Sequence, residues 1–287
     1  MRNRRLAAIA GLWLTSVIVG GCGGGTSGMS IATTAPGGAR AQIPTTLTKP
    51  DGPGPFPAIV IMHDCSGLGT SSSGAPGRWA KELVGRGYVV LMPDGFTERG
   101  FPYGICTDAS PSRMDVSAAR RADDAYATFA YARTLSYVDG SHIGIMGGSH
   151  GGTTVLVTMA SPPPATSGFV AAVALYPACT PRRGGVDAQL YRPVAPVLIL
   201  IGEKDDWTPA DACRKLADAA QGAGQPVAIK IYPGAHHSFD SNNPVRYVAR
   251  RLNANAPGGR GATTGGHPQA WADSIREVTA FFARYLR

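Results

Sequence analysis

Short continuous apolar runs alternate with helix-like segments along most of this chain of 287 residues. The runs AIVIM at 58–62, YVVLM at 88–92 and VLILI at 197–201 are typical of strands buried on both faces of a sheet. Strands that alternate with helices indicate βαβ units. The sequence therefore predicts an α/β fold with a mostly parallel central sheet flanked by helices. In such sheets ligands bind at the carboxyl ends of the strands.

The element boundaries follow from the hydrophobic periodicity and from the glycine and proline positions. The long Gly/Pro/Ser-rich segment 95–112 is predicted to be a loop, and loops of that length are often functional. A second loop is expected between 232 and 268. The predicted strands are 41–49 (a short pair), 56–63, 88–92, 142–146, 169–175, 197–201 and 227–232, and the predicted helices are 77–87, 114–135, 150–159, 209–221 and 268–286.

Residues 1–22 have the pattern of a secretion signal. Arginines at 2, 4 and 5 form a positive start, and the apolar segment 6–19 is short for a membrane span. The following Val-Gly-Gly-Cys resembles the bacterial lipobox, which implies a lipid on Cys22. The alternative is a plain signal peptide with an incidental cysteine. We expect an exported protein of the bacterial cell envelope, lipid-anchored at the outer membrane or otherwise periplasmic or secreted.

The residues after Cys22 are rich in Gly, Ser, Thr and Ala, a composition typical of flexible linkers. The sequence thus predicts a flexible linker over 23–40 and one folded domain over 41–287. The formal charge of +8 falls to +5 (24 minus 19) without the three N-terminal arginines, and it is spread without long basic runs. This favours an ordinary solvated surface over a nucleic-acid partner.

One serine, Ser149, lies among glycines directly after a predicted strand, in the sequence IMGGSHGG. The pattern G-x-S-x-G is typical of a nucleophile on a strained turn from strand to helix. The alternative is a simple glycine-rich turn. Gly147 and Gly151 would remove side chains that collide with the neighbouring strand and helix at such a turn.

Two further strand ends carry reactive side chains. Asp205 follows LILIGEK and His237 follows IKIYPGA, which gives the order Ser, Asp, His expected of a hydrolase triad. In that triad histidine takes the serine proton, and the carboxylate orients the imidazole. The neighbours Asp206 and His236 are alternatives, although the G-x-x-D spacing favours Asp205.

The oxyanion of an acyl-transfer reaction needs two backbone N–H donors. His150, directly after the serine, is expected to supply one of them. The loop HDCSG after AIVIM is expected to supply the other, from Cys65 in preference to Asp64. Asp64, Tyr103 and Trp207 are expected to line the substrate pocket, with core packing as the alternative for Trp207.

The four cysteines after Cys22 are an even number in a chain expected in an oxidising compartment. They allow three connectivities, among which spacing does not choose. Because no CxxC or paired Cys/His spacing suggests zinc, two disulfides are favoured over a metal site or free thiols. We expect no metal and no organic cofactor.

Several segments together resemble the dienelactone hydrolase family of the α/β-hydrolases over about residues 50–286. They are HDCSGL, RADDA, IGIMGGSHGG, LYPAC, LILIGEKDDWTPADAC and YPGAHHSF. The resemblance implies an α/β-hydrolase fold and the triad Ser149, Asp205 and His237, and it favours His237 over His236. It also implies the disulfides Cys179–Cys213 and Cys65–Cys106. The chain departs from the family in having serine where the founding enzymes have cysteine, and Asp64 where related hydrolases have glycine.

These features predict a serine hydrolase that cleaves small carboxylic esters through an acyl-enzyme. A peptidase or amidase could use the same triad. A non-catalytic envelope lipoprotein that binds a ligand and a polymer-degrading enzyme are further alternatives. The sequence does not predict the natural substrate or the oligomeric state.

Overall fold

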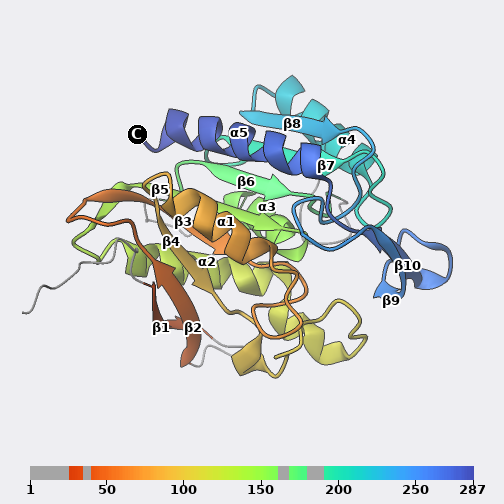
Figure 1. The fold of residues 1–287 in the computed structure, drawn as a ribbon, viewed down its shortest axis with the longest axis horizontal. Coiled ribbons are helices and arrows are strands. Elements are labelled where there is room, and N and C mark those ends of the chain that lie inside the picture. Colours follow the sequence, from red (N-terminus) through yellow and green to blue (C-terminus); the bar gives the residue numbers. More distant parts are fainter. Residues whose placement is uncertain (1–25, 35–39, 161–167, 180–190) are drawn as a thin grey trace, which may run out of the picture.

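The computed structural model describes residues 26–34, 40–160, 168–179 and 191–287. The predicted signal segment and Cys22 lie outside these residues. An eight-stranded sheet in the order β1-β2-β4-β3-β5-β6-β7-β8 forms the centre of the structure (Figure 1). Its strands are β1 Thr26–Thr34, β2 Arg40–Thr48, β3 Phe56–Met62, β4 Val89–Pro93, β5 Val138–Gly148, β6 Ala172–Leu175, β7 Val197–Gly202 and β8 Val227–Tyr232.

The six strands from β4 to β8 in the sheet order run parallel, which confirms the predicted α/β architecture. Their apolar runs are buried on both faces. Ile59, Ile145 and Ile199, for example, are all 0% exposed. The carboxyl ends of these strands therefore meet at one edge of the sheet, where Ser149, Asp205 and His237 follow β5, β7 and β8.

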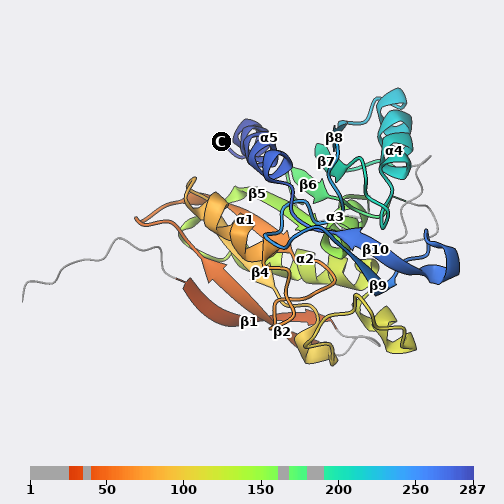
Figure 2. The ribbon, with the colours of Figure 1, turned by 45° about the vertical axis from the view of Figure 1, so that its right-hand side comes forward.

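Helices cover both faces of the sheet (Figures 1 and 2). Trp79 and Trp271 pack edge to face at 4.7 Å, so α1 and α5 share one face. The chain direction across the sheet reverses after β4, and right-handed crossovers then place α2, α3 and α4 on the other face. The helices are α1 Ala75–Val84, α2 Ala118–Ala132, α3 His150–Ala160, α4 Ala210–Gly222 and α5 Pro268–Tyr285.

Strand β1 corrects the predicted linker over 23–40 and the domain start at 41. Residues 26–34 pair antiparallel with β2 along their whole length. Ile31 is 3% exposed, and the hydroxyl of Thr33 donates to Asp124 on α2 at 3.1 Å. The composition was typical of a linker, but Met29, Ile31 and Thr33 alternate with the period of two that a half-buried strand requires.

A two-stranded ribbon corrects the loop predicted between 232 and 268. Strands β9 Arg246–Leu252 and β10 Arg260–Thr264 pair antiparallel, and they are joined through a short 3₁₀ turn, Pro257–Gly259. The ribbon projects on the side toward which the parallel strands point (Figure 2). Its polar, arginine-rich sequence has no apolar run that would predict a strand.

Several smaller boundaries also differ from the predictions. Strand β5 begins at Val138 and β6 begins at Ala172. The segment 95–112 contains the short 3₁₀ helix Thr97–Arg99 and the start of another, Pro111–Val116. Among the described residues, no helix has the length and apolarity to cross a bilayer.

Candidate active site

Ser149 occupies the sharp turn between β5 and α3. Its backbone has a φ of 53°, in the left-handed region that non-glycine residues rarely adopt. The backbone N–H of Ser149 donates to the carbonyl of Leu175 in β6 at 2.9 Å, which holds the turn against the sheet. A Cβ on Gly147 would lie 2.6 Å from the carbonyl carbon of Gly151, and a Cβ on Gly151 would collide with the carbonyl oxygen of Met62. The flanking glycines therefore make room for this turn.

His237, in the loop after β8, lies between Ser149 and Asp205. Its Nε2 is 2.8 Å from the Ser149 Oγ, and its Nδ1 is 2.8 Å from the Asp205 Oδ2. The side chain of His237 is buried, and Ser149 is 8% exposed. The hydroxyl, the imidazole and the carboxylate thus form one continuous hydrogen-bonded chain across three strand ends.

Asp205 is oriented by the turn that follows β7. Its Oδ1 accepts the backbone N–H groups of Trp207 at 3.0 Å and Thr208 at 2.8 Å. The hydroxyl of Thr208 donates to Oδ2 at 3.0 Å and also lies 3.0 Å from the His237 Nδ1. These donors fix the direction of the carboxylate toward His237.

The adjacent candidates Asp206 and His236 lie elsewhere. The Asp206 carboxylate accepts the backbone N–H and the hydroxyl of Thr263 in β10, each at 2.8 Å. His236 directs its Nδ1 to the carbonyl of Lys204 at 3.0 Å. Asp206 thus anchors the ribbon, and the hydrogen-bonded chain contains Asp205 and His237.

The two expected oxyanion donors belong to different segments of the chain. His150 is the first residue of α3, where backbone N–H groups have no acceptor within the helix and the helix dipole is positive. Cys65 lies in the turn after β3, and its carbonyl accepts the N–H of Ile105 at 2.7 Å. A disulfide to Cys106 further attaches this turn to the segment 95–112.

The structure forms both disulfides that the family resemblance implied, Cys65–Cys106 and Cys179–Cys213. The second bridge links the segment after β6 to α4. Among the described residues, no group of three or more His, Cys, Asp or Glu side chains is arranged to hold a metal ion.

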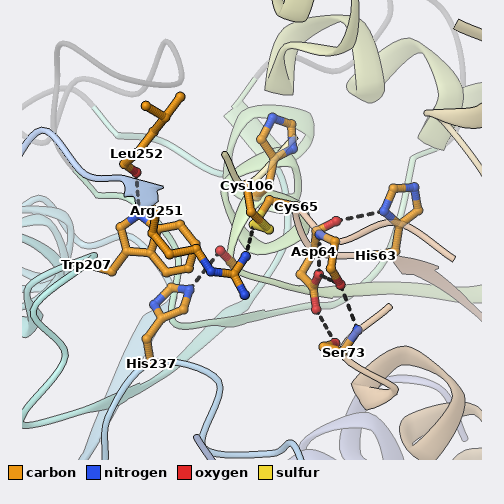
Figure 3. Close-up of a disulfide and its surroundings, with 12 residues drawn as sticks. His63, Asp64, Cys65, Ser73, Cys106, Trp207, His237, Arg251 and Leu252 are labelled. Carbon is orange, nitrogen blue, oxygen red and sulfur yellow. Dashed lines mark hydrogen bonds between the residues drawn. A yellow bond between two sulfur atoms is a disulfide. The ribbon is translucent and has the colours of Figure 1, made fainter. Parts of the chain in front are cut away.

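Two predicted pocket residues have other surroundings. The Asp64 carboxylate is 4% exposed and accepts hydrogen bonds from Ser66 and Ser73, so it stabilises its own loop (Figure 3). The Tyr103 side chain is 74% exposed, so solvent surrounds most of its ring. That these two side chains line the substrate pocket stays a prediction.

Trp207 lies directly against His237, with ring centroids 4.7 Å apart. Its indole N–H donates to the carbonyl of Leu252 in β9 at 2.7 Å. Trp207 therefore links the imidazole to the ribbon.

Arg251 in β9, which no sequence pattern predicted as a site residue, lies beside Trp207 (Figure 3). Its guanidinium carbon lies 5.1 Å from the centre of the Trp207 ring, and its Nη1 is 3.9 Å from the Cys65 sulfur. Among the described residues, its buried Nε has no hydrogen-bond partner. No sequence signal pointed to Arg251, because the pairing of β9 with β10 gives it this position.

His63 is a buried imidazole beneath the Cys65 turn. Its Nδ1 lies 2.8 Å from the Asp64 carbonyl, and its Nε2 accepts the N–H of Gly95 at 3.3 Å. One nitrogen must therefore donate and the other accept, which is the neutral form. Burial, reinforced by the nearby Arg121 cation, holds the pKa of His63 well below its usual value.

Comparisons with known proteins agree with this fold. The sequence profile of the dienelactone hydrolase family matches residues 43–286, and the chain belongs to that family. A relative from Methylorubrum extorquens, described as "Putative carboxymethylenebutenolidase", is 27% identical over 214 residues, which cover 72% of this chain and 71% of the relative.

Solved structures share the fold. A "Putative Dienelactone Hydrolase" from Klebsiella pneumoniae is 21% identical with a TM-score of 0.67, and the match covers 91% of this chain and 100% of that one. Esterase 2 of Thermogutta terrifontis is 18% identical with a TM-score of 0.60, and the match covers 90% and 94% of the two chains. The protein is thus a hydrolase with the α/β-hydrolase fold.

The neutral state of His63 predicts a pH-dependent contribution to stability. Below about pH 6.5 the unfolded chain protonates this imidazole while the folded chain does not, so the stability of the wild type falls with falling pH. His63→Gln keeps a donor and an acceptor but does not titrate. We expect the stability advantage of the wild type over His63→Gln to shrink by about 1.4 kcal/mol between pH 7.5 and pH 5.5. Urea unfolding at both pH values measures this, and a constant difference contradicts it.

Proposed function

We propose that this protein hydrolyses carboxylic esters, with Ser149 as nucleophile, His237 as general base and acid, and Asp205 as the group that orients His237. The single observation that carries the proposal is the hydrogen-bonded chain from Ser149 to Asp205, with both links at 2.8 Å. A serine hydroxyl is a weak nucleophile at neutral pH, and a histidine within hydrogen-bond reach makes it reactive by taking its proton.

The reaction proceeds in two halves. In the first, the Ser149 Oγ attacks the ester carbonyl carbon while its proton passes to the His237 Nε2. The tetrahedral intermediate collapses when His237 returns that proton to the alcohol, which leaves with the bonding electron pair. In the second half, His237 takes a proton from water while the water oxygen attacks the carbonyl carbon of the acyl-serine. The bond from that carbon to the Ser149 Oγ then breaks, the Oγ keeps the bonding electron pair and takes the proton from His237, and the carboxylic acid leaves.

Two backbone donors are assigned to the developing oxyanion. The His150 N–H lies at the start of α3, directly after the nucleophile, and the Cys65 N–H lies in the turn after β3. One donor belongs to a helix, and the other belongs to a turn that a disulfide holds in place. Both supports favour a preorganised oxyanion hole. The Asp205 carboxylate stabilises the imidazolium that forms at each step.

Arg251 favours substrates that carry an anionic group. It places a cation beside Trp207 and the Cys65 turn, and its buried Nε has no hydrogen-bond partner within the part of the chain that the structure describes. The name of the Methylorubrum relative refers to a lactone with a carboxymethylene substituent, which fits such a cation. We extend this to a preference of our protein for esters or lactones with a carboxylate near the scissile bond.

A peptidase or amidase could use the same groups, because the same triad also cleaves amides. A binding lipoprotein without catalysis would not need the complete hydrogen-bonded chain. Labelling by a fluorophosphonate probe separates the binding lipoprotein from both kinds of enzyme.

We also propose that the chain is exported and attached to a membrane through a lipid on Cys22, on the sequence pattern alone. The wild type is expected in the membrane fraction and Cys22→Ser in the soluble fraction of the host cell. If the wild type and Cys22→Ser divide equally between the two fractions, the proposed lipid on Cys22 is contradicted and a plain signal peptide is favoured.

Replacement of the serine should abolish turnover. Ser149→Ala is expected to reduce the hydrolysis of p-nitrophenyl esters by at least about 10³-fold, because no other group supplies the nucleophile. A fluorophosphonate probe should label the wild type and not the variant. A folded wild type that neither hydrolyses these esters nor reacts with the probe would favour a binding protein.

The adjacent aspartates provide a matched pair. Asp205→Asn is expected to lower kcat by about 10³- to 10⁴-fold, because the amide no longer stabilises the required tautomer and imidazolium. Asp206→Asn should change kcat less than about tenfold, because Asp206 touches the ribbon and not His237. A larger loss in Asp206→Asn than in Asp205→Asn would contradict the assignment.

The preference for anionic substrates is tested with two esters of similar length, p-nitrophenyl hemisuccinate and p-nitrophenyl butyrate. Arg251→Gln should lower the ratio of kcat/KM for the charged over the neutral ester by about tenfold, the worth of one charged hydrogen bond. The neighbouring exposed Arg250 is the control, and Arg250→Gln should preserve the ratio. An unchanged ratio in Arg251→Gln would remove Arg251 from substrate selection.

A further inference from the structure

Arg121, on α2, is a buried cation that no step of the ester mechanism uses. Its side chain is 0% exposed. One of its nitrogens, Nη1, donates to the carbonyl of His63 at 2.9 Å and lies 2.9 Å from the His150 Nδ1. A guanidinium can only donate, so the His150 Nδ1 must accept, and the proton of this imidazole is on Nε2.

The two partners of Arg121 belong to the two segments that hold the proposed oxyanion donors. His63 precedes the turn that carries the Cys65 N–H by two residues, and His150 carries the other N–H itself. These segments follow different strands, β3 and β5. The Nη1 of Arg121 thus contacts both segments and fixes the distance between them.

Aromatic contacts complete this arrangement. Phe96 lies edge to face with His63 at 4.5 Å and with His150 at 5.7 Å. The Arg121 guanidinium lies 4.9 Å from the centre of the same ring. Two imidazoles and one cation therefore surround Phe96, which limits the directions in which either histidine can move.

The stability of the fold does not account for a buried arginine at this position. Among the described residues, the Arg121 Nε and Nη2 are buried without a hydrogen-bond partner. The buried carboxylate of Asp124, on the same helix, pairs with Arg99 at 2.6 and 2.7 Å. Burial lowers the pKa of Arg121 to about 10, which leaves it charged at neutral pH. Burying an incompletely paired cation destabilises a fold.

We propose that Arg121 is a positioning residue that holds the Cys65 turn and the start of α3 at the separation required to bind the oxyanion. This inference rests on the proposed function. Because Arg121 acts through His63 and His150, its loss should weaken binding of the tetrahedral state more than binding of the ester. Removing one oxyanion donor costs other hydrolases about 10²- to 10³-fold in kcat, so a displaced pair should cost about 10- to 100-fold.

The test compares Arg121→Met, Arg121→Lys and His150→Phe with the wild type. The last variant removes the acceptor Nδ1 but keeps the backbone N–H and a ring against Phe96. Measured quantities are kcat, KM and the inhibition constant of an alkyl trifluoromethyl ketone, which forms a tetrahedral adduct with a serine. Arg133→Met is the control, because Arg133 is an exposed arginine at the end of the same helix.

Arg121→Met should lower kcat by about 10- to 100-fold with KM within about threefold, and it should weaken the ketone by the same factor as kcat. Arg121→Lys should recover part of the loss. His150→Phe should shift kcat and the ketone constant in the same direction. The double variant Arg121→Met/His150→Phe should have a kcat no lower than the poorer single variant. Both changes remove the same contact, the one between Arg121 and the His150 Nδ1.

The proposal is overturned if Arg121→Met loses thermal stability but keeps the wild-type kcat and ketone constant. It is also overturned if kcat falls while the ketone binds as before, or if the two single effects multiply in the double variant. If Arg121→Met does not fold, wild-type values of kcat and of the ketone constant in folded His150→Phe overturn it. A wild type without esterase activity would instead refute the proposed function.

Discussion

The backbone of Ser149 is the constraint on which the rest of the site depends. Ser149 is held at a φ of 53° because its N–H donates to the carbonyl of Leu175 at the end of β6. Gly147 and Gly151 also allow β5, α3 and β3 to approach closely. This turn projects the Oγ beyond the sheet edge and makes His150 the first residue of α3. The relative positions of the Ser149 hydroxyl, the His237 imidazole and the start of α3 are therefore fixed before any substrate binds.

Neighbouring residues with the same side chain have divided roles in this protein. Asp205 orients His237, whereas Asp206 holds β10, and Trp207 contacts both the imidazole and β9. One short turn after β7 therefore supports the hydrogen-bonded chain and also fixes the ribbon that carries Arg251. This coupling explains how a polar, arginine-rich ribbon can lie at a defined position beside the site. On the proposed preference for anionic substrates, the ribbon sets that preference through Arg251.

The sequence predicted the parallel sheet and the strand-end positions of Ser149, Asp205 and His237, because buried parallel strands are continuous apolar runs. It favoured Asp205 over Asp206 by the G-x-x-D spacing alone, since both follow the same strand and the turn geometry separates them. It missed β1, whose small residues resemble a linker, and the β9–β10 ribbon, whose stability comes from contacts with Asp206, Trp207 and Cys106 rather than from its own apolar residues. Arg121 and Arg251 were missed for the same reason, because only tertiary contacts give them their positions.

The central claim is that Ser149 becomes covalently acylated during turnover. Rapid-quench mass spectrometry of the protein mixed with p-nitrophenyl acetate tests it most directly. We expect a burst of about one p-nitrophenolate per chain, together with an acetyl group on the peptide that contains Ser149. Ester hydrolysis with no acetylated Ser149 peptide at any quench time, or with the acetyl group on another residue, would contradict the account.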